Sequence, residues 1–279
     1  MRKFVLLLIA FLFSVFSVKA ADDVLKVLAI GNSFSVDAVE QNLYELAAAQ
    51  GKKLLIGNAY IGGCSIDSHW EFIQSNAEKY AYRKIVDGKK TNKPKQNLTD
   101  IIKDEDWDII TLQQASHFSG QYGTYSNLKN LKERVKSLAT NPKVRFAFHM
   151  TWAYQQNSTH DGFKNYDNNQ TVMYRSICKA VNHAMHEVGI TDVIPSGRAI
   201  QIAREMVGDT LTRDGYHLSY VMGRYIAACT WCEFLTGKSV VGNSYRPAGL
   251  SAEAAKNAQQ AADKAFRHVK KALRKGETL

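Results

Sequence analysis

The chain contains few cysteines, four in 279 residues: Cys64, Cys178, Cys229 and Cys232. The last two are separated by two residues, but they fall inside a helix predicted over residues 221–235. There the spacing fits neither disulfide geometry nor a redox site at the start of a helix. No second Cys or His pair with matching spacing follows, which argues against a zinc site. We therefore predict buried free thiols and no metal site, although a disulfide would be permissible in an exported protein.

Long apolar runs are also scarce. The run at residues 4–18 has about fifteen residues, fewer than the roughly twenty needed to span a bilayer. Arg2 and Lys3 precede the run, and small residues end it at Ala20, which is the pattern of a cleaved secretory signal peptide. We predict a signal peptide over residues 1–20 and export to the bacterial periplasm or the extracellular space. Because the run is too short to span a bilayer, we expect no stable membrane anchor, and because no cysteine follows it, we expect no lipid anchor.

A basic stripe with interleaved aromatic residues, typical of nucleic-acid binders, is missing. The whole chain carries a net charge of +10, and loss of Arg2, Lys3 and Lys19 with the leader would leave +7. The excess is spread along the chain, with a local concentration in a predicted C-terminal helix. There only Phe266 accompanies the basic residues Lys264, Arg267, Lys270, Lys271, Arg274 and Lys275. We interpret this run as a solvated helix face and expect no nucleic-acid partner. Weak attraction to acidic polysaccharides stays open.

Internal repeats and low-complexity segments are absent, and the composition is that of one globular domain. Residues 21–279 are enough for a single α/β domain, and 45% hydrophobic with 22% charged residues is ordinary for a soluble protein. The one strongly polar stretch, residues 87–99, precedes a short predicted helix. We interpret it as a surface excursion inside the domain.

Predicted strands and helices alternate along the chain. Strands are expected at 24–30, 54–60, 107–113, 145–150 and 191–194; helices are expected at 38–50, 128–138, 169–188, 199–207, 221–235 and 252–274. Strands separated by helices pair in parallel, and ligands then bind at the carboxyl ends of the strands. The pattern predicts an α/β fold, a three-layer α/β/α sandwich around a central, mainly parallel sheet.

Two short segments far apart in the chain contain the residues of a serine nucleophile system. Gly31-Asn32-Ser33 follows the first predicted strand, so Ser33 lies at the amino end of the next helix, near unpaired backbone N–H groups. Asp214 and His217 lie three residues apart in a turn that contains glycine. Acyl transfer by serine needs this set: Ser33 as nucleophile, His217 as base and Asp214 to orient the imidazole. This chemistry requires no cofactor.

These two segments resemble the first block and the closing D-x-x-H block of the SGNH (GDSL-like) hydrolases. The resemblance, which also fits a subgroup of largely unassigned function, runs from about residue 25 to residue 238 and implies a flavodoxin-like sandwich. It places Gly62 and Gly63 at the second block, where a backbone N–H joins the oxyanion hole.

The third block departs from the usual Gly-x-Asn-Asp. The chain has Gln113-Gln114-Ala-Ser, which is similar to the Gln-Gly-Glu-Ser of some carbohydrate esterases. The alignment implies an oxyanion hole made by Ser33, Gly63 and Gln113, with Gln114 as the alternative in a register shifted by one residue.

Other residues at the same edge are candidates for substrate binding. His149 and Trp152 follow the fourth predicted strand, and the flat face of Trp152 suits a sugar ring, although core packing explains this residue equally well. Gly62 and Gln114 complete the candidates. His69, His117 and His160 lack a placed partner and are interpreted as surface or hydrogen-bonded histidines.

Three function classes remain after this reading. The sequence favours an exported serine esterase that removes acetyl or another small acyl group from a glycan. A non-catalytic carbohydrate-binding protein on a hydrolase scaffold would be expected to lack one of the three catalytic residues, and all three are present. A metal-dependent phosphodiesterase or sulfatase would need more than Asp37 and Asp67 near the first two blocks. The substrate and the oligomeric state stay open.

Overall fold

The computed structural model describes residues 24–275, so the predicted signal peptide lies outside the described residues. Within this part, seven strands form one sheet in the order β4-β3-β2-β1-β5-β6-β7. The strands are β1 (Leu25–Gly31), β2 (Leu54–Tyr60), β3 (Tyr80–Val86), β4 (Lys89–Gln96), β5 (Ile109–Leu112), β6 (Arg145–His149) and β7 (Asp192–Ile194). Five neighbouring strands pair in parallel, in the order β2, β1, β5, β6 and β7. The β3–β4 hairpin is added antiparallel to β2.

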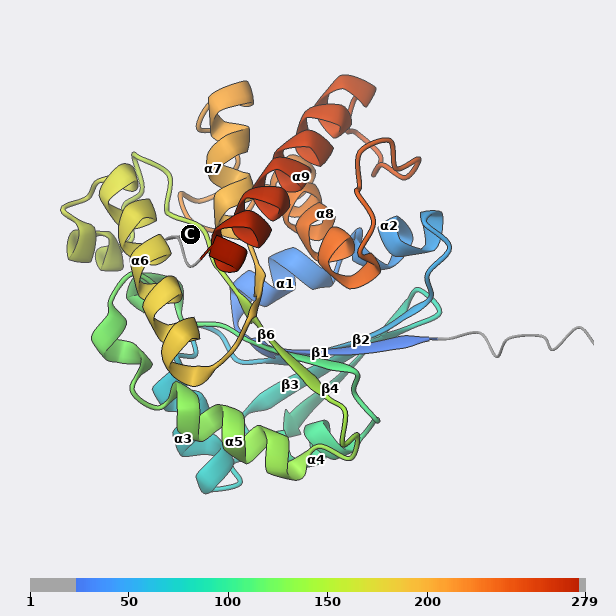
Figure 1. The fold of residues 1–279 in the computed structure, drawn as a ribbon, viewed down its shortest axis with the longest axis vertical. Helices are drawn as coiled ribbons and strands as arrows, with labels where there is room; N and C mark the ends of the chain where they lie inside the picture. Colours follow the sequence, from blue (N-terminus) through green and yellow to red (C-terminus); the bar gives the residue numbers. More distant parts are fainter. Residues whose placement is uncertain (1–23, 276–279) are drawn as a thin grey trace, which may run out of the picture.

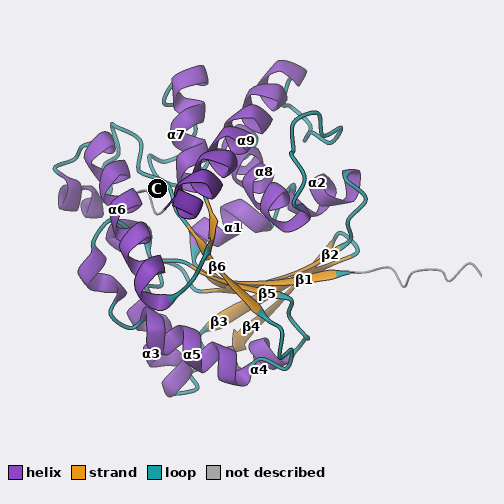
Figure 2. Ribbon diagram, in the orientation of Figure 1, coloured by secondary structure: helices purple, strands orange, loops and turns teal. Residues whose placement is uncertain are grey.

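Helices cover both faces of this sheet, as Figures 1 and 2 show. On one face lie α1 (Ser33–Val39), α2 (Leu43–Ala49), α7 (Ser196–Val207), α8 (Met222–Thr236) and α9 (Ala252–Lys275). The other face carries α3 (Ile66–Gln74), α4 (Leu98–Lys103) and α5 (Leu128–Leu138), with α6 (Gln170–Val188) packed beside α5. The predicted three-layer α/β/α sandwich is confirmed. No helix in residues 24–275 combines the length and apolarity needed to cross a membrane.

Burial on both faces explains the apolar composition of the central strands. β1 is buried from Val27 to Gly31, and α8 is buried almost all round because α1, α2, α7 and α9 surround it. All four cysteines are free and buried, as the sequence predicts. Burial raises the pKa of the Cys64 thiol to about 12.

The polar stretch at 87–99, predicted to be a surface excursion, instead adds a strand to the sheet. Most of it is β4, an exposed edge strand that turns back on β3 through Asp87 and Gly88. Both turn residues have positive φ, 48° and 74°, which is typical of a tight hairpin turn. Because β4 is rich in lysine and includes Pro94, its sequence lacks the alternation of apolar and polar residues that predicts a strand. The same residues protect a sheet edge from pairing with another strand.

The helix predicted over 38–50 is also corrected. It is two helices, α1 and α2, separated at Asn42, whose φ of 66° interrupts the helical path. Tyr245 donates a hydrogen bond to the Asn42 side chain at 3.0 Å. Because α1 begins earlier than predicted, Ser33 is its first residue. α3 and the β3–β4 hairpin were not predicted.

Candidate active site

Ser33 lies where the central strand β1 ends and α1 begins. Asn32 caps the helix, because its Oδ1 accepts a hydrogen bond from Phe34 N–H at 3.0 Å. The chain can pass here only without a side chain at position 31, since a Cβ on Gly31 would lie 2.8 Å from both Gln113 Cδ and Ser35 Oγ. The neighbouring strands β2 and β5 run parallel to β1 on either side. Ser33 is therefore at the point of the sheet where α/β folds bind ligands.

Asp214 holds the His217 imidazole. Its Oδ2 lies 2.7 Å from His217 Nδ1, and its Oδ1 accepts the backbone N–H of His217 at 2.8 Å. Partial burial opposes ionisation of the carboxyl, but these hydrogen bonds outweigh that effect and lower the pKa of Asp214. An ionised carboxylate accepts a hydrogen bond from Nδ1–H, which leaves His217 Nε2 with the lone pair of a base.

Asp37 fixes this loop to the helix that carries Ser33. The Asp37 side chain is fully buried and accepts the backbone N–H of Leu218 at 2.8 Å. It also binds Arg224 at 2.7 Å and Arg213 at 3.1 Å. Asp37 belongs to α1 and Leu218 follows His217 directly, so the contact sets the distance between nucleophile and base. From the sequence, Asp37 was a candidate only for metal binding, and this role was not predicted.

Ser33 and His217 line the same pocket, of about 460 Å³. The pocket is also lined by Tyr60, Gly62 and Gly63, by Tyr216 beside His217, and by two further segments, Ser116-His117 and His160-Asp161-Gly162. Within residues 24–275, the Ser33 hydroxyl forms no hydrogen bond. Catalytic hydrogen bonds often shorten only when substrate is present.

Backbone N–H groups face this pocket from two segments. Ser33 N–H is at the first position of a helix, where no intrahelical acceptor exists. Gly63 N–H has no acceptor in the described part of the chain, and Gly63 has a φ of 65°. Two hydrogen bonds hold the Gly63 loop against the nucleophile turn, from Ile61 N to Gly31 O at 3.3 Å and from Asn32 Nδ2 to Cys64 O at 3.0 Å.

Gln113 lies behind the nucleophile turn and outside the pocket. Its Nε2 donates to Asn32 Oδ1 at 2.8 Å, and its Oε1 accepts from His149 Nδ1 at 2.9 Å. Because both amide atoms are engaged with buried partners, the geometry favours a positioning role for Gln113 over direct contact with an oxyanion. This corrects the role that the third-block alignment implied.

Gln114 does not reach the pocket in the shifted register either. Its Nε2 donates to Thr124, and its Oε1 accepts the backbone N–H groups of Ile66 and Ala115 at 3.0 and 2.8 Å. These bonds join β5 to the start of α3. Gln114 therefore has a structural environment, and the third oxyanion donor of the resemblance is absent from the lining of the pocket.

His149 and Trp152, the candidate substrate-binding residues, are core residues. Both are 0% exposed, and Trp152 stacks on Phe34 with ring centroids 4.2 Å apart. Burial lowers the pKa of His149 to about 3. Trp152 donates Nε1–H to Tyr216 O at 2.8 Å, so it supports the catalytic loop from beneath.

His117, His160 and Tyr216 are the pocket residues that sequence reasoning missed as functional. They come from three loops, and their convergence depends on tertiary packing that no local pattern records. Gly162 is a sequence signal of this packing, because a Cβ at that position would lie 2.3 Å from the Cβ of His117. The 3-10 segments Ser116–Phe118 and Asp161–Tyr166 thus require a glycine to pack this closely.

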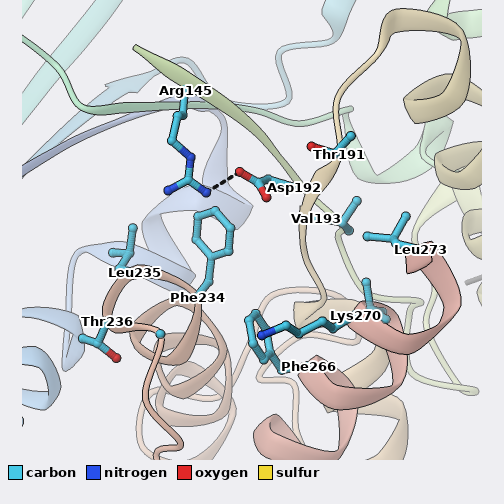
Figure 3. A pocket seen from close by; sticks show the side chains of 12 residues that line it. Arg145, Thr191, Asp192, Val193, Phe234, Leu235, Thr236, Phe266, Lys270 and Leu273 are labelled. Carbon is cyan, nitrogen blue, oxygen red and sulfur yellow. Dashed lines mark hydrogen bonds and ion pairs between the residues drawn. The ribbon is translucent and has the colours of Figure 1, made fainter. Parts of the chain in front are cut away.

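A second cavity, of about 400 Å³, lies at the opposite edge of the sheet (Figure 3). Arg145 and Asp192, at the amino ends of β6 and β7, form an ion pair of 2.5 Å there. Phe266 and Lys270 of α9 form its other wall. The lining of this cavity contains no serine, cysteine or histidine, so the Ser33 pocket is the candidate active site. In residues 24–275 no group of three or more His, Cys, Asp or Glu side chains is arranged to hold a metal ion.

Comparisons with known proteins agree with this architecture. A family model described as a domain of unknown function, DUF4886, matches residues 26–265. The crystal structure of a DUF4886 family protein from Bacteroides uniformis ATCC 8492 is 48% identical, with a TM-score of 0.86, over 88% of this chain and 96% of that chain. None of the curated proteins compared with the chain matches it.

Among solved structures, proteins of much lower identity also match this chain. The structure of a candidate GDSL-like lipase from Parabacteroides merdae ATCC 43184 has a TM-score of 0.51 at 14% identity, covering 77% of this chain and 96% of that chain. A catalytic mutant of an acetylxylan esterase from Geobacillus stearothermophilus has a TM-score of 0.49 at 11% identity, covering 75% and 93%.

Proposed function

The chain belongs to the DUF4886 family and has the α/β fold of the SGNH hydrolases, and from its site we propose that it is a serine esterase acting on a carboxylic ester. One observation carries the proposal: Ser33 lines the same pocket as His217, whose imidazole is held by Asp214. Unpaired N–H groups of Ser33 and Gly63 accompany them. Nucleophile, oriented base and oxyanion donors are the groups that acyl transfer by serine requires.

In the proposed reaction, Ser33 Oγ attacks the ester carbonyl carbon while its proton passes to His217 Nε2. Asp214 stabilises the resulting imidazolium through its 2.7 Å contact with Nδ1. The oxygen that becomes negative receives hydrogen bonds from the N–H groups of Ser33 and Gly63.

The tetrahedral intermediate then collapses. Its bond to the alcohol oxygen breaks, and His217 gives its proton to that oxygen, so the alcohol leaves and an acyl-Ser33 ester remains. Water, deprotonated by His217, attacks the acyl-serine. The carboxylic acid is released, and Ser33 recovers its proton from His217.

We further propose that the protein is exported and that its natural reaction is O-deacetylation of a glycan. The leader pattern at residues 1–20 supports export. A pocket of about 460 Å³ has the size of a small-molecule site, and rings of Tyr60 and Tyr216 in its lining suit the apolar face of a sugar. The alternative, a non-catalytic carbohydrate-binding protein on this scaffold, predicts binding without turnover.

The test measures hydrolysis of 4-nitrophenyl acetate and acetate release from a panel of acetylated polysaccharides. Ser33→Ala and His217→Ala should each lower turnover by roughly 10³–10⁶-fold, as loss of a triad member does in other serine hydrolases. His186→Asn, on the exposed face of α6, is the matched control and should keep wild-type rates. Wild-type turnover in Ser33→Ala would refute the serine mechanism, and glycan binding with no turnover in the wild type would favour the binding protein.

A further inference from the structure

Four aromatic rings stand in a row along the pocket, beginning at the catalytic base. Tyr216 lies 4.1 Å from His217, His160 lies 4.7 Å from Tyr216, and His117 lies 6.1 Å from His160, all between ring centroids. All four residues line the pocket. The proposed mechanism uses only His217, so we define the other three, Tyr216, His160 and His117, as the ring row.

The position of the ring row assigns it to one half of the ester. When the tetrahedral intermediate collapses, His217 gives its proton to the leaving oxygen, so the leaving alcohol must lie beside His217. Tyr216 adjoins His217 in the lining of the pocket. The carbonyl oxygen lies instead toward the N–H groups of Ser33 and Gly63. The ring row is therefore placed to contact the alcohol part of the substrate.

The chemistry of the ring row is aromatic, polar and uncharged. His160 Nδ1 accepts the backbone N–H of Gly162 at 2.9 Å, which leaves Nε2–H as a donor. Burial lowers the pKa of His117, assisted by repulsion from His160, and burial also lowers the pKa of His160 despite nearby Asp161. Both imidazoles are thus neutral at neutral pH and can exchange hydrogen bonds with hydroxyl groups.

Two carboxylates influence the same half of the pocket. Asp161 lines it and is paired with Lys164 at 3.1 Å, and ionised Asp214 lies behind His217. Because the histidines are neutral and the lining contains no lysine or arginine, the pocket offers no cation to an anionic ligand. A neutral sugar has hydroxyl groups for the imidazoles and C–H faces for the rings.

The ring row is held in place by the loops behind it. The backbone of Gly162 packs against His117, where a Cβ would lie at 2.3 Å. Buried Tyr154 contacts both His160 and Tyr216, with centroids 4.9 and 5.7 Å apart, and its hydroxyl bonds to Ser116 Oγ at 2.8 Å. A rigid, preformed subsite binds with little loss of conformational freedom.

From this geometry we infer that Tyr216, His160 and His117 form a leaving-group subsite that selects esters of an uncharged sugar over esters of an acidic sugar. The inference rests on the proposed esterase function and adds the residues and the charge class that determine its specificity.

The experiment compares kcat/KM for three acetyl esters: acetylated xylo-oligosaccharides, acetylated galacturonan oligosaccharides and 4-nitrophenyl acetate. The wild type should prefer the neutral oligosaccharide to the acidic one by about tenfold or more. His160→Asn keeps an acceptor for Gly162 N–H but lacks the Nε2 donor. It should lower the ratio of neutral-oligosaccharide to 4-nitrophenyl ester kcat/KM about tenfold, the effect of one lost hydrogen bond.

Tyr216→Leu, which keeps apolar bulk without a flat face, should lower the same ratio mainly by raising KM for the oligosaccharide. His186→Asn is the control and should leave the ratio unchanged, and thermal unfolding checks that each variant is folded. An active wild type that prefers the acidic oligosaccharide, or variants with an unchanged ratio, would overturn the inference while leaving the esterase in place. A wild type inactive on all three esters would refute the esterase function and the inference with it.

Discussion

Asn32 is the residue that links the nucleophile turn to the core. One side-chain oxygen accepts both Phe34 N–H and Gln113 Nε2–H, and its amide nitrogen donates to Cys64 O. Gln113 in turn is held by His149. Three buried side chains thus fix the backbone that presents Ser33, and catalytic groups need such support to stay in productive geometry.

Gln113→Ala should therefore lower both activity and stability. Removal of the amide leaves Asn32 with one partner fewer and leaves His149 Nδ1 without its acceptor, a loss of about 1–3 kcal/mol in the free energy of unfolding. We expect kcat to fall only about tenfold, because the backbone N–H donors remain. Urea denaturation and steady-state kinetics measure the two effects.

Gln114→Ala is the matched control for this variant. It also removes buried hydrogen bonds, but these lie between β5 and α3, so stability should fall with kcat little changed. A kcat loss of roughly 10²–10³ in Gln113→Ala at unchanged stability would instead identify Gln113 as a direct oxyanion donor.

At the scale of elements, α1 and the 212–218 loop act together through Asp37. Asp37→Asn would leave Arg224, which is 7% exposed, without its buried counter-charge. Breaking a buried ion pair in this way costs about 3–5 kcal/mol. We expect that loss in chemical denaturation, together with reduced kcat as the His217 loop loosens.

Asp67→Asn provides the comparison for Asp37→Asn. Asp67 is exposed and accepts a single hydrogen bond from Asn127, so its loss should change stability by less than about 0.5 kcal/mol. Equal, small effects of the two substitutions would show that Asp37 does not anchor the loop.

Elements with a strong apolar period were predictable from the sequence. β2 and α5 have the predicted bounds, because burial on fixed faces imposes a regular pattern. The β3–β4 hairpin was not predictable in this way. The strand Lys89–Gln96 is exposed, so no buried face imposes an apolar pattern on its sequence. Asn42 similarly breaks a helix through a backbone conformation that helical periodicity does not report.

For the whole molecule, the junction of α8 and α9 contains a buried acid. Burial and repulsion from Asp263 raise the pKa of Glu233 from its ordinary 4.5 to about 7, although Val240 N–H opposes this shift. Asp263 is bound by Arg267 at 2.7 Å and by Ser239. Glu233 therefore keeps its proton in the folded state at pH values where the unfolded chain has lost it.

This difference makes stability depend on pH. A raised carboxyl pKa means that the folded state binds more protons between about pH 4.5 and 7, so the free energy of unfolding falls as pH rises through this window. In Glu233→Gln, this decline in the free energy of unfolding, of up to about 3 kcal/mol, should be absent. Denaturation of both proteins from pH 4 to 8 measures it. Parallel pH profiles would contradict a protonated Glu233.

The candidate site was predictable only where its residues carry a motif. Ser33, Asp214 and His217 were named from short segments, because local spacing presents an oriented hydroxyl or a paired imidazole. The ring row and the Asp37 anchor join loops that are distant in sequence, so only packing brings them together. Gln113 shows the intermediate case: a motif marked the position, and the contacts of its amide determined the role.

Covalent labelling by a fluorophosphonate probe, located by peptide mass spectrometry, shows directly whether Ser33 is a nucleophile. Ser35 is the matched control, because it lies two residues away but is fully buried, with its hydroxyl bound to Asn32 O at 2.7 Å and to Asn58 at 2.8 Å. If Ser33 is the nucleophile, we expect one adduct on Ser33 in the wild type and in Ser35→Ala, and none in Ser33→Ala. Labelling of Ser33→Ala to the wild-type extent, or an adduct on another serine, would contradict this role of Ser33.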